Sequence, residues 1–478
     1  MTRRGRLTAA ALGGVLVLTG CTSFAERVAD VADTPAATPT EAPTGAAACP
    51  DERAAPDPDR PQVALSFDLS EDRRTVTGTE TVVFTPDLDV DELVFRLVPN
   101  APGSAEAGSS LVVDDVTGDD VAAGSYESLG AAGPGGAYVV ELSDELAAGD
   151  ATEVTLAFTL TLGEGGFDRV GTDDEVSWWA SGAPLLAWEP GVGWSRAPFV
   201  DLLGETASSP VADTRITVEA PAELTVLMTG DQAEPTDAGD GRRRWTSREP
   251  VARDVSVAVG SFTTASAEVD GVRVTAGVLA GDRQDPQEVA DATAQDVERL
   301  AERFGPFPYA TLTVPVLPDY GGGIEYPSSI LLASAAPVVL LHEVAHMWFY
   351  GMVGDDQYRD PWLDEAFASY AESVEGALSP AHVEQALAEE APVGGTMADF
   401  PTDAAYIETV YGKGAAALAE ARDAAGAEAF DTAVRCYVDA TAWTTATPAD
   451  LALALADLPA ATRVLVEAGA LDEDDLPD

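Results

Sequence analysis

The chain of 478 residues is 46% hydrophobic and carries 82 acidic against 26 basic residues, which gives a formal net charge of −56. This balance excludes electrostatic binding to nucleic acid or to an anionic lipid surface, because both need clustered positive charge. The length and the hydrophobic content suit two or three domains with cores of their own.

The N-terminal stretch MTRRGRLTAAALGGVLVLTGC has the features of an export signal. A basic start precedes an apolar run too short to span a bilayer, and small residues lead directly to Cys21. This ending resembles the bacterial lipobox. We therefore predict a lipoprotein signal peptide at residues 1–20, and a lipidated Cys21 that anchors the protein to the outer face of the bacterial cell membrane. A secreted soluble chain cleaved nearby is the alternative, and the Arg3-Arg4 pair leaves the export route open.

The next segment, residues 21–58, is rich in Ala, Thr and Pro and contains the stretch ADTPAATPTEAPTGAAA. Such a composition cannot bury enough apolar surface to offset the entropy of ordering, so we expect a disordered, lipid-anchored tether. Cys49 and Cys436 are the cysteines other than Cys21, and in an oxidising compartment they can pair. Sequence separation alone leaves this pairing open.

Residues 59–262 show short runs in which every second residue is apolar, such as TVTGTETVVFTP, EVTLAFTLTLG and VSVAVGSF. This period predicts strands with one buried face, and the number of runs favours an all-β, sandwich-like N-terminal domain.

Residues 263–478 have a different period. QDPQEVADATAQDVERLAERFG predicts a helix that ends at Gly305. A strand at ATLTVPVLP, the glycine-rich DYGGGIEYPSS and a strand at ILLAS follow, and after Pro337 the remainder is predicted to be almost entirely helical. The chain is thus expected to be multidomain, with an α+β, mostly helical second domain.

The first helix after Pro337 contains LLHEVAHMWFYG, with two of the three histidines of the chain. His342 and His346 lie four residues apart, on one face of a helix, and can present their imidazoles to one metal ion. Glu343 points about 100° around the helix, where it suits a general base acting on metal-bound water. A buried helix with two hydrogen-bonded histidines is the structural alternative.

A catalytic zinc site needs a third protein ligand and one open position. In RDPWLDEAFASYAESVEG, Asp360 is predicted to cap a helix with Pro361 at its first position, and Glu365 lies one turn in. Taken alone, Glu365 reads as a solvated acidic residue.

Together these pieces resemble the signature of the aminopeptidase N family of gluzincin metallopeptidases: His-Glu-x-x-His, then 18 residues, then Glu. The resemblance implies a thermolysin-like catalytic domain with one Zn²⁺ bound by His342, His346 and Glu365. In the third-ligand helix, Asp364 and Ala366 replace the Asn and Gly that are common in the family.

Two more segments carry the resemblance. GGGIEYPSS is similar to the family's Gly-x-Met-Glu-Asn strand, which implies that Glu325 binds the α-amine of a peptide, with Tyr326 in place of Asn. Gly322 and Gly323 would let the substrate backbone approach. ETVYGKGAAAL resembles the family's Tyr-x-Lys-Gly-Ala segment, which assigns Tyr411 to the oxyanion.

Glu372, two turns beyond Glu365, is hypothesised to orient a ligand histidine, and Glu189 is hypothesised to be a second amine contact. Tyr406, Tyr350 and Tyr370 compete with Tyr411 and are interpreted as packing residues.

The sequence therefore predicts a zinc aminopeptidase that acts on peptides, with an oligomeric state that stays open. Many family members continue into a large helical domain, whereas this chain ends at Asp478, so we expect an open site. A zinc endopeptidase with an open cleft and a non-catalytic peptide-binding lipoprotein are the alternatives.

Overall fold

The computed structural model describes residues 49–477, except 165–167, 205–206, 319–320, 335, 375 and 377. The predicted signal peptide, Cys21 and most of the predicted tether lie outside the described residues. Within the described ranges, no helix is long and apolar enough to cross a membrane.

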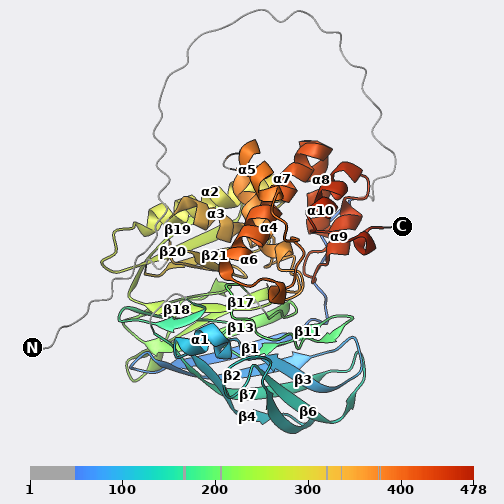
Figure 1. Cartoon of the computed structure of the whole chain (residues 1–478). Helices are drawn as coiled ribbons and strands as arrows, with labels where there is room; N and C mark the ends of the chain where they lie inside the picture. Colours follow the sequence, from blue (N-terminus) through green and yellow to red (C-terminus); the bar gives the residue numbers. More distant parts are fainter. Residues whose placement is uncertain are drawn as a thin grey trace, which may run out of the picture. The chain divides into compact units, whose positions relative to one another are not determined.

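The first part of the described chain is built on an eight-stranded sheet (Figure 1). Its order is β15 (Asp231–Gln232), β17 (Arg242–Ala252), β13 (Ala212–Pro221), β1 (Gln62–Leu69), β2 (Thr75–Phe84), β7 (Thr152–Thr161) and β4 (Ser110–Thr117), with β16 (Thr236–Gly239) on β17. The strands β1 and β13 pair in parallel, and the other neighbours are antiparallel.

Two four-stranded sheets complete the sandwich. One has the order β10 (Leu185–Leu186), β3 (Val90–Arg96), β6 (Ala137–Leu146) and β5 (Val121–Glu127); the other has the order β14 (Thr225–Met228), β18 (Ser256–Gly260), β9 (Val176–Ala180) and β8 (Val170–Thr172). Alternate residues such as Phe67, Phe158 and Phe95 are buried in one core between these sheets and the large sheet, as the period of two predicts. The remaining short elements are η1 (Val98–Asn100), α1 (Pro102–Glu106) and the pair β11 (Trp188–Glu189) and β12 (Gly193–Trp194).

A fifth sheet begins at Phe262, with the order β19 (Phe262–Val269), β20 (Val272–Leu279), β21 (Thr311–Val316), β23 (Ser329–Leu332) and β22 (Gly323–Tyr326). Both of its faces are covered. Ile330 and Leu332 pack into the core shared with the helices, whereas Leu331 and Tyr326 pack against the sheet that contains β9 and β18. The strand β22 is an edge strand of this sheet and carries Glu325.

Helices form the rest of the chain (Figure 1). They are α2 (Pro286–Phe304), α3 (Pro337–Ala345), α4 (Trp362–Ala371), η2 (Glu372–Val374), α5 (Pro380–Leu387), η3 (Met397–Asp399), α6 (Asp403–Tyr406), η4 (Ile407–Lys413), α7 (Gly414–Ala425), α8 (Ala427–Ala440), α9 (Pro448–Ala454), α10 (Pro459–Glu467) and η5 (Glu473–Asp475). The helix α2 begins after Asp285, which caps the N–H of Gln287, and stops at Gly305, as predicted. The predicted fold class is confirmed.

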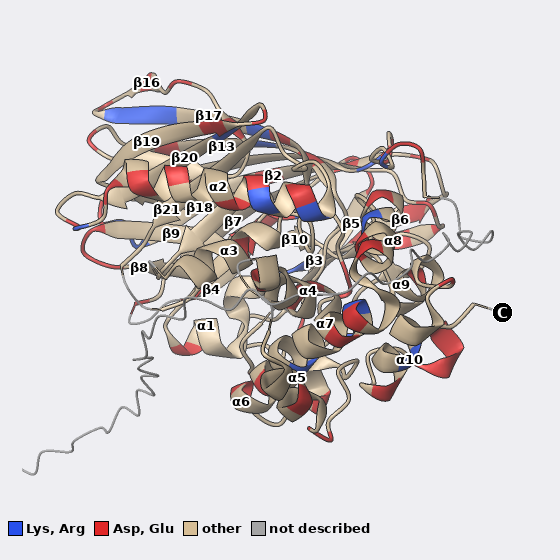
Figure 2. Ribbon diagram, turned by 90° about the horizontal axis from the view of Figure 1, so that it is seen from above, with Lys and Arg blue, Asp and Glu red and all other residues tan. Residues whose placement is uncertain are grey.

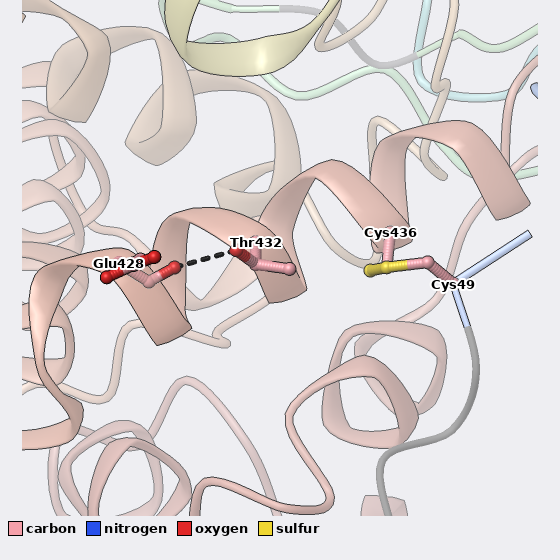
Figure 3. The surroundings of a disulfide bond; sticks show 4 residues. All are labelled: Cys49, Glu428, Thr432 and Cys436. Atoms are coloured by element: carbon pink, nitrogen blue, oxygen red, sulfur yellow. Dashed lines mark hydrogen bonds between the residues drawn. A yellow bond between two sulfur atoms is a disulfide. The ribbon is translucent and has the colours of Figure 1, made fainter. Parts of the chain in front are cut away.

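Cys49 and Cys436 form a disulfide between the start of the described chain and α8 (Figure 3). Their sequence separation is 387 residues and their Cα atoms lie 4.8 Å apart. The same segment continues along α8, where Arg53 forms an ion pair of 2.9 Å with Asp439. The pairing that the sequence left open is therefore present.

Acidic residues are distributed over the helices, and several basic residues gather on β17 (Figure 2). These arginines are paired locally: Arg244 with Glu219 at 2.6 Å and Arg248 with Asp213 at 2.7 Å. Each of these pairs cancels one positive charge on the strand.

Candidate active site

The predicted site residues converge on one cavity of about 360 Å³ between α3, α4, β22 and η4. Apart from Glu189, the residues that the sequence assigned to the site line it: Gly322, Gly323, Glu325, His342, Glu343, His346, Glu365, Glu372 and Tyr411. The cavity therefore joins the separate motifs into a single site.

His342 and His346 lie on one face, but only His342 is inside the helix. The helix α3 ends at Ala345, and His346 is its C-cap with φ −61° and ψ −13°. Because these angles are still helical, the spacing of four residues keeps its geometry and the ring centroids are 4.8 Å apart.

Glu365 completes the donor set. Its Oε2 lies 3.2 Å from Nε2 of His342 and 3.4 Å from Nε2 of His346. Its helix α4 begins one residue later than predicted: Pro361 is the N-cap, without a side-chain capping bond, so the Asp360 cap is wrong. Glu365 nevertheless lies in the first turn and faces both imidazoles.

The donor set fits zinc. One nitrogen of each histidine and one oxygen of Glu365 lie within 4.8 Å of one another, and two imidazoles with one carboxylate are a common set for catalytic zinc. The opposite ring nitrogens also meet carboxylates: Nδ1 of His342 is 3.1 Å from Glu372, and Nδ1 of His346 is bonded to Asp364. Carboxylates in this position fix the tautomer that turns the Nε2 lone pair to the metal.

Asp364 was missed in the sequence. The sequence indicates Asp364 only as a replacement for the Asn that is common in the family. In the structure Asp364 is fully buried, and its carboxylate is hydrogen-bonded to Nδ1 of His346. Gln357 supports it in turn, since Nε2 donates to Asp364 and to Asp355, both at 2.9 Å. The sequence signal that could have indicated this role is the position of a carboxylate, Asp364, directly before the third ligand Glu365.

Glu343 lies beside the ligand set. It is 4% exposed, and its Oε2 has no hydrogen-bond partner within the described part of the chain. Burial raises the pKa of its carboxyl to about 7, a value suited to accepting and returning a proton near neutral pH. Gly323 makes room for it: a Cβ at that position would come within 2.6 Å of Cγ of Glu343. Gly323 thus serves the close approach of β22 to α3, in addition to any role toward substrate.

Glu325 projects from β22 into the same cavity. It is 5% exposed, its Oε1 is unpartnered among the described residues, and burial raises the pKa of its carboxyl to about 8. An oxygen of Glu325 also lies within 4.8 Å of donor atoms of His346 and Asp364. A buried carboxylate oxygen without a partner is costly unless a ligand satisfies it.

Tyr411 lies on the π-helical segment η4, and such segments are frequent at functional sites. Its hydroxyl donates to Oε1 of Glu365 at 2.5 Å, and its ring stacks on His342 at 5.8 Å. Tyr406 packs against Tyr411 at 5.7 Å. Tyr411 is the only tyrosine among the described residues that line the cavity.

Part of the cavity wall comes from the sandwich, and its residues were not anticipated: Asp168, Arg169, Leu203 and Gly204. Glu189 does not line the cavity, because its carboxylate is bonded to Arg359. The structure therefore does not support Glu189 as an amine contact. Which sandwich residues reach the cavity depends on the arrangement of strands and loops that are far apart in the sequence. No local sequence pattern indicates these residues.

The donor set, carried on α3 and α4, suits a catalytic zinc ion. Residues 326–468 match the model of the peptidase family M1 domain, and the resemblance to the aminopeptidase N family is confirmed.

Relatives and solved structures agree with this family. The chain is 26% identical to an aminopeptidase N of Streptomyces lividans over 271 residues, which cover 47% of this chain and 31% of the relative. It is 25% identical to aminopeptidase M1-B of Oryza sativa subsp. japonica over 278 residues, 50% of this chain and 32% of the relative. The chain thus spans about a third of the length of these relatives.

The fold is similar to the crystal structure of an M1 zinc metallopeptidase from Deinococcus radiodurans, with a TM-score of 0.64 and 19% identity. The likeness covers 86% of this chain and 92% of that chain. It therefore extends over the sandwich as well as the helical part.

Proposed function

We propose that this protein is a zinc-dependent aminopeptidase that removes N-terminal residues from peptides. The observation that carries the proposal is the Glu325 carboxylate, one oxygen of which has no partner among the described residues. It lies in the same cavity as the donor set His342, His346 and Glu365. A carboxylate at this place pairs with the α-ammonium group of a peptide. The first peptide bond, one residue from that ammonium group, then lies at the metal-binding residues, which makes cleavage exopeptidic.

The residues divide the chemistry between them. Zinc, when bound, supplies a Lewis acid that polarises the carbonyl and makes water nucleophilic near neutral pH. Glu343 accepts the proton of the attacking water and returns it to the leaving amine. The Tyr411 hydroxyl, which lies next to the donor set, donates a hydrogen bond to the carbonyl oxygen as negative charge develops there.

The test compares aminoacyl fluorogenic amides with the same compounds N-acetylated, each with and without a zinc chelator. Chelator-sensitive cleavage of the free amines only is the expected result. Cleavage of the acetylated compounds would instead identify an endopeptidase with an open cleft. Binding without cleavage would identify a peptide-binding lipoprotein, an alternative that the buried base Glu343 disfavours.

We also propose that the protein is exported and anchored to the outer face of the bacterial membrane through Cys21. The support is the sequence MTRRGRLTAAALGGVLVLTGC, which combines a basic start, an apolar run and a cysteine after small residues. Labelled palmitate should be incorporated by the wild-type chain and not by the Cys21→Ser variant. Equal labelling of both would contradict the lipid anchor.

A further inference from the structure

Glu325 and Tyr326 are neighbours on β22 and face opposite sides of the sheet, because side chains alternate along a strand. Glu325 lines the catalytic cavity. Tyr326 points the other way, is 1% exposed and packs in the core shared with β9 and β18. The residue that replaces the family's Asn is therefore directed at the sandwich.

The Tyr326 hydroxyl is the first group of a chain of hydrogen bonds. It lies 3.2 Å from Oγ of Ser181, and Ser181 donates to Oδ2 of Asp254 at 2.5 Å. A serine hydroxyl has one hydrogen, and here Asp254 takes it. Tyr326 is therefore the donor to Ser181, and the chain runs in one direction from β22 to the carboxylate.

The far end of this hydrogen-bonded chain has further contacts in the sandwich. Asp254 also accepts the N–H of Val255 at 2.6 Å, and Ser181 and Asp254 flank the paired strands β9 and β18. Ser181 has a positive φ of 50°, which is uncommon for a residue other than glycine. All of these groups lie in the sandwich and outside the metal-binding helices α3 and α4.

The remainder of the β22–β23 hairpin is tied to the same region. The N–H of Gly230 donates to Oγ of Ser328 at 2.9 Å, and Ser256 donates to Oγ of Ser329 at 2.7 Å. These two bonds hold the turn and β23. Within the described part of the chain β22 is an edge strand, and the hydroxyl of Tyr326 ties it to Ser181 of the sandwich.

We infer that Tyr326 is a positioning residue: through Ser181 and Asp254 it fixes the strand that presents the Glu325 carboxylate to a substrate amine. This inference rests on the proposed function, because it gives Glu325 the amine. It also means that the sandwich contributes to recognition of the substrate N-terminus without touching it.

The test measures binding of L-leucine hydroxamate and its N-acetylated form to the zinc-loaded protein by calorimetry. The variants are Tyr326→Phe and Ser181→Ala, which each remove one hydroxyl of the chain. We expect the free-amine compound to bind about three- to tenfold more weakly in both variants, and the acetylated compound to bind as in the wild type. The double variant should bind like either single variant, because both changes break one chain.

The matched control is Tyr437→Phe. Tyr437 is 1% exposed, and its hydroxyl has no hydrogen-bond partner within the described ranges, so its removal should leave both dissociation constants unchanged.

Three results would overturn the inference. These are unchanged binding of the free amine, equal weakening of both compounds, and a wild type that does not prefer the free amine. Cleavage of aminoacyl amides by the wild type, measured separately, tests the proposed function, so the two failures are distinguishable.

Discussion

The two ends of the cavity are supported in different ways. At the metal end, formed by His342, His346 and Glu365, the carboxylates that hold the histidines are close in sequence: Glu372 is 30 positions from His342, and Asp364 is 18 positions from His346. Each imidazole therefore has its partner close in the chain, Asp364 on α4 and Glu372 at the start of η2, directly after α4.

The amine end, formed by Glu325 on its edge strand, depends on distant residues. Tyr326 is 145 positions from Ser181, its partner in the sandwich. Glu325 keeps one oxygen without a partner among the described residues, whereas both oxygens of Glu365 are bonded. The metal end is thus complete in itself, while the amine end is left for a ligand to complete. The two ends should respond separately to mutation.

The largest effect is expected at neither end but at the base between them. Glu343→Gln should lower kcat about 10²- to 10⁴-fold, because the buried amide cannot accept the proton of water. Zinc content, measured by atomic emission, should stay at the wild-type level because Glu343 is not a ligand. Loss of zinc in this variant would contradict the separation of base and metal end.

Removing the charge at the amine end should affect only substrates with a free N-terminus. Glu325→Gln is expected to lower kcat/KM for aminoacyl amides roughly 10- to 100-fold, since a charge-assisted hydrogen bond is lost. Zinc affinity should not change. If zinc affinity fell as well, the proximity of Glu325 to His346 and Asp364 would indicate that it belongs to the metal end.

At the metal end, Asp364→Ala should weaken zinc affinity about 10- to 100-fold, as is usual when the carboxylate behind a ligand histidine is lost. Glu372→Ala is the matched variant. Its effect should be smaller, because the Glu372 side chain is 33% exposed and water can replace it, whereas Asp364 is fully buried. Competition with a fluorescent chelator measures both affinities, and equal losses would contradict this ranking.

The smallest expected effect is on the pH dependence of folding stability, through a buried glutamate that contacts the hairpin carrying Glu325. Glu249 bonds the Ser328 hydroxyl of the β22–β23 hairpin, and burial raises the pKa of its carboxyl from 4.5 to about 7. Between these values the unfolded chain has lost a proton that the folded chain retains, so folding stability falls as pH rises through this window. Glu249→Gln should remove the part of this dependence that comes from Glu249, so that stability falls less steeply with pH than in the wild type.

The measurement is thermal unfolding of the wild type and the variant at pH 5 and pH 8. The variant should gain in melting temperature relative to the wild type at pH 8, by an amount that corresponds to about 1–3 kcal/mol. Glu298→Gln, at an exposed position of α2, is the control and should follow the wild type. An equally steep fall in stability from pH 5 to pH 8 in Glu249→Gln and in the wild type would exclude a contribution from Glu249.

The metal end could be predicted because helical spacing is a local property. His342, His346 and Glu365 follow from residues four apart and from the next helix, and Glu372 follows from its place on that helix. The ends of these two helices were not predicted correctly. The helix α3 ends before His346, and Pro361 instead of Asp360 occupies the N-cap of α4. Single caps are decided by packing more than by residue preference.

The amine end could be predicted only in part. Resemblance placed Glu325, but nothing near Tyr326 in the sequence indicates Ser181. Arg169 and Leu203 reach the cavity from loops of the sandwich, and Glu189, chosen from the same region, is held elsewhere by Arg359. Contacts between residues far apart in the chain depend on strand order, which alternating hydrophobicity does not specify.

The disulfide has a consequence for the molecule after damage. Because Cys49 and Cys436 are joined at a sequence separation of 387, the chain between them forms a covalent ring. This ring contains the residues of both ends of the cavity. A single cut by a foreign protease anywhere in that ring opens it without releasing a fragment. The nicked protein stays one molecule, and the two pieces separate only when the disulfide is reduced.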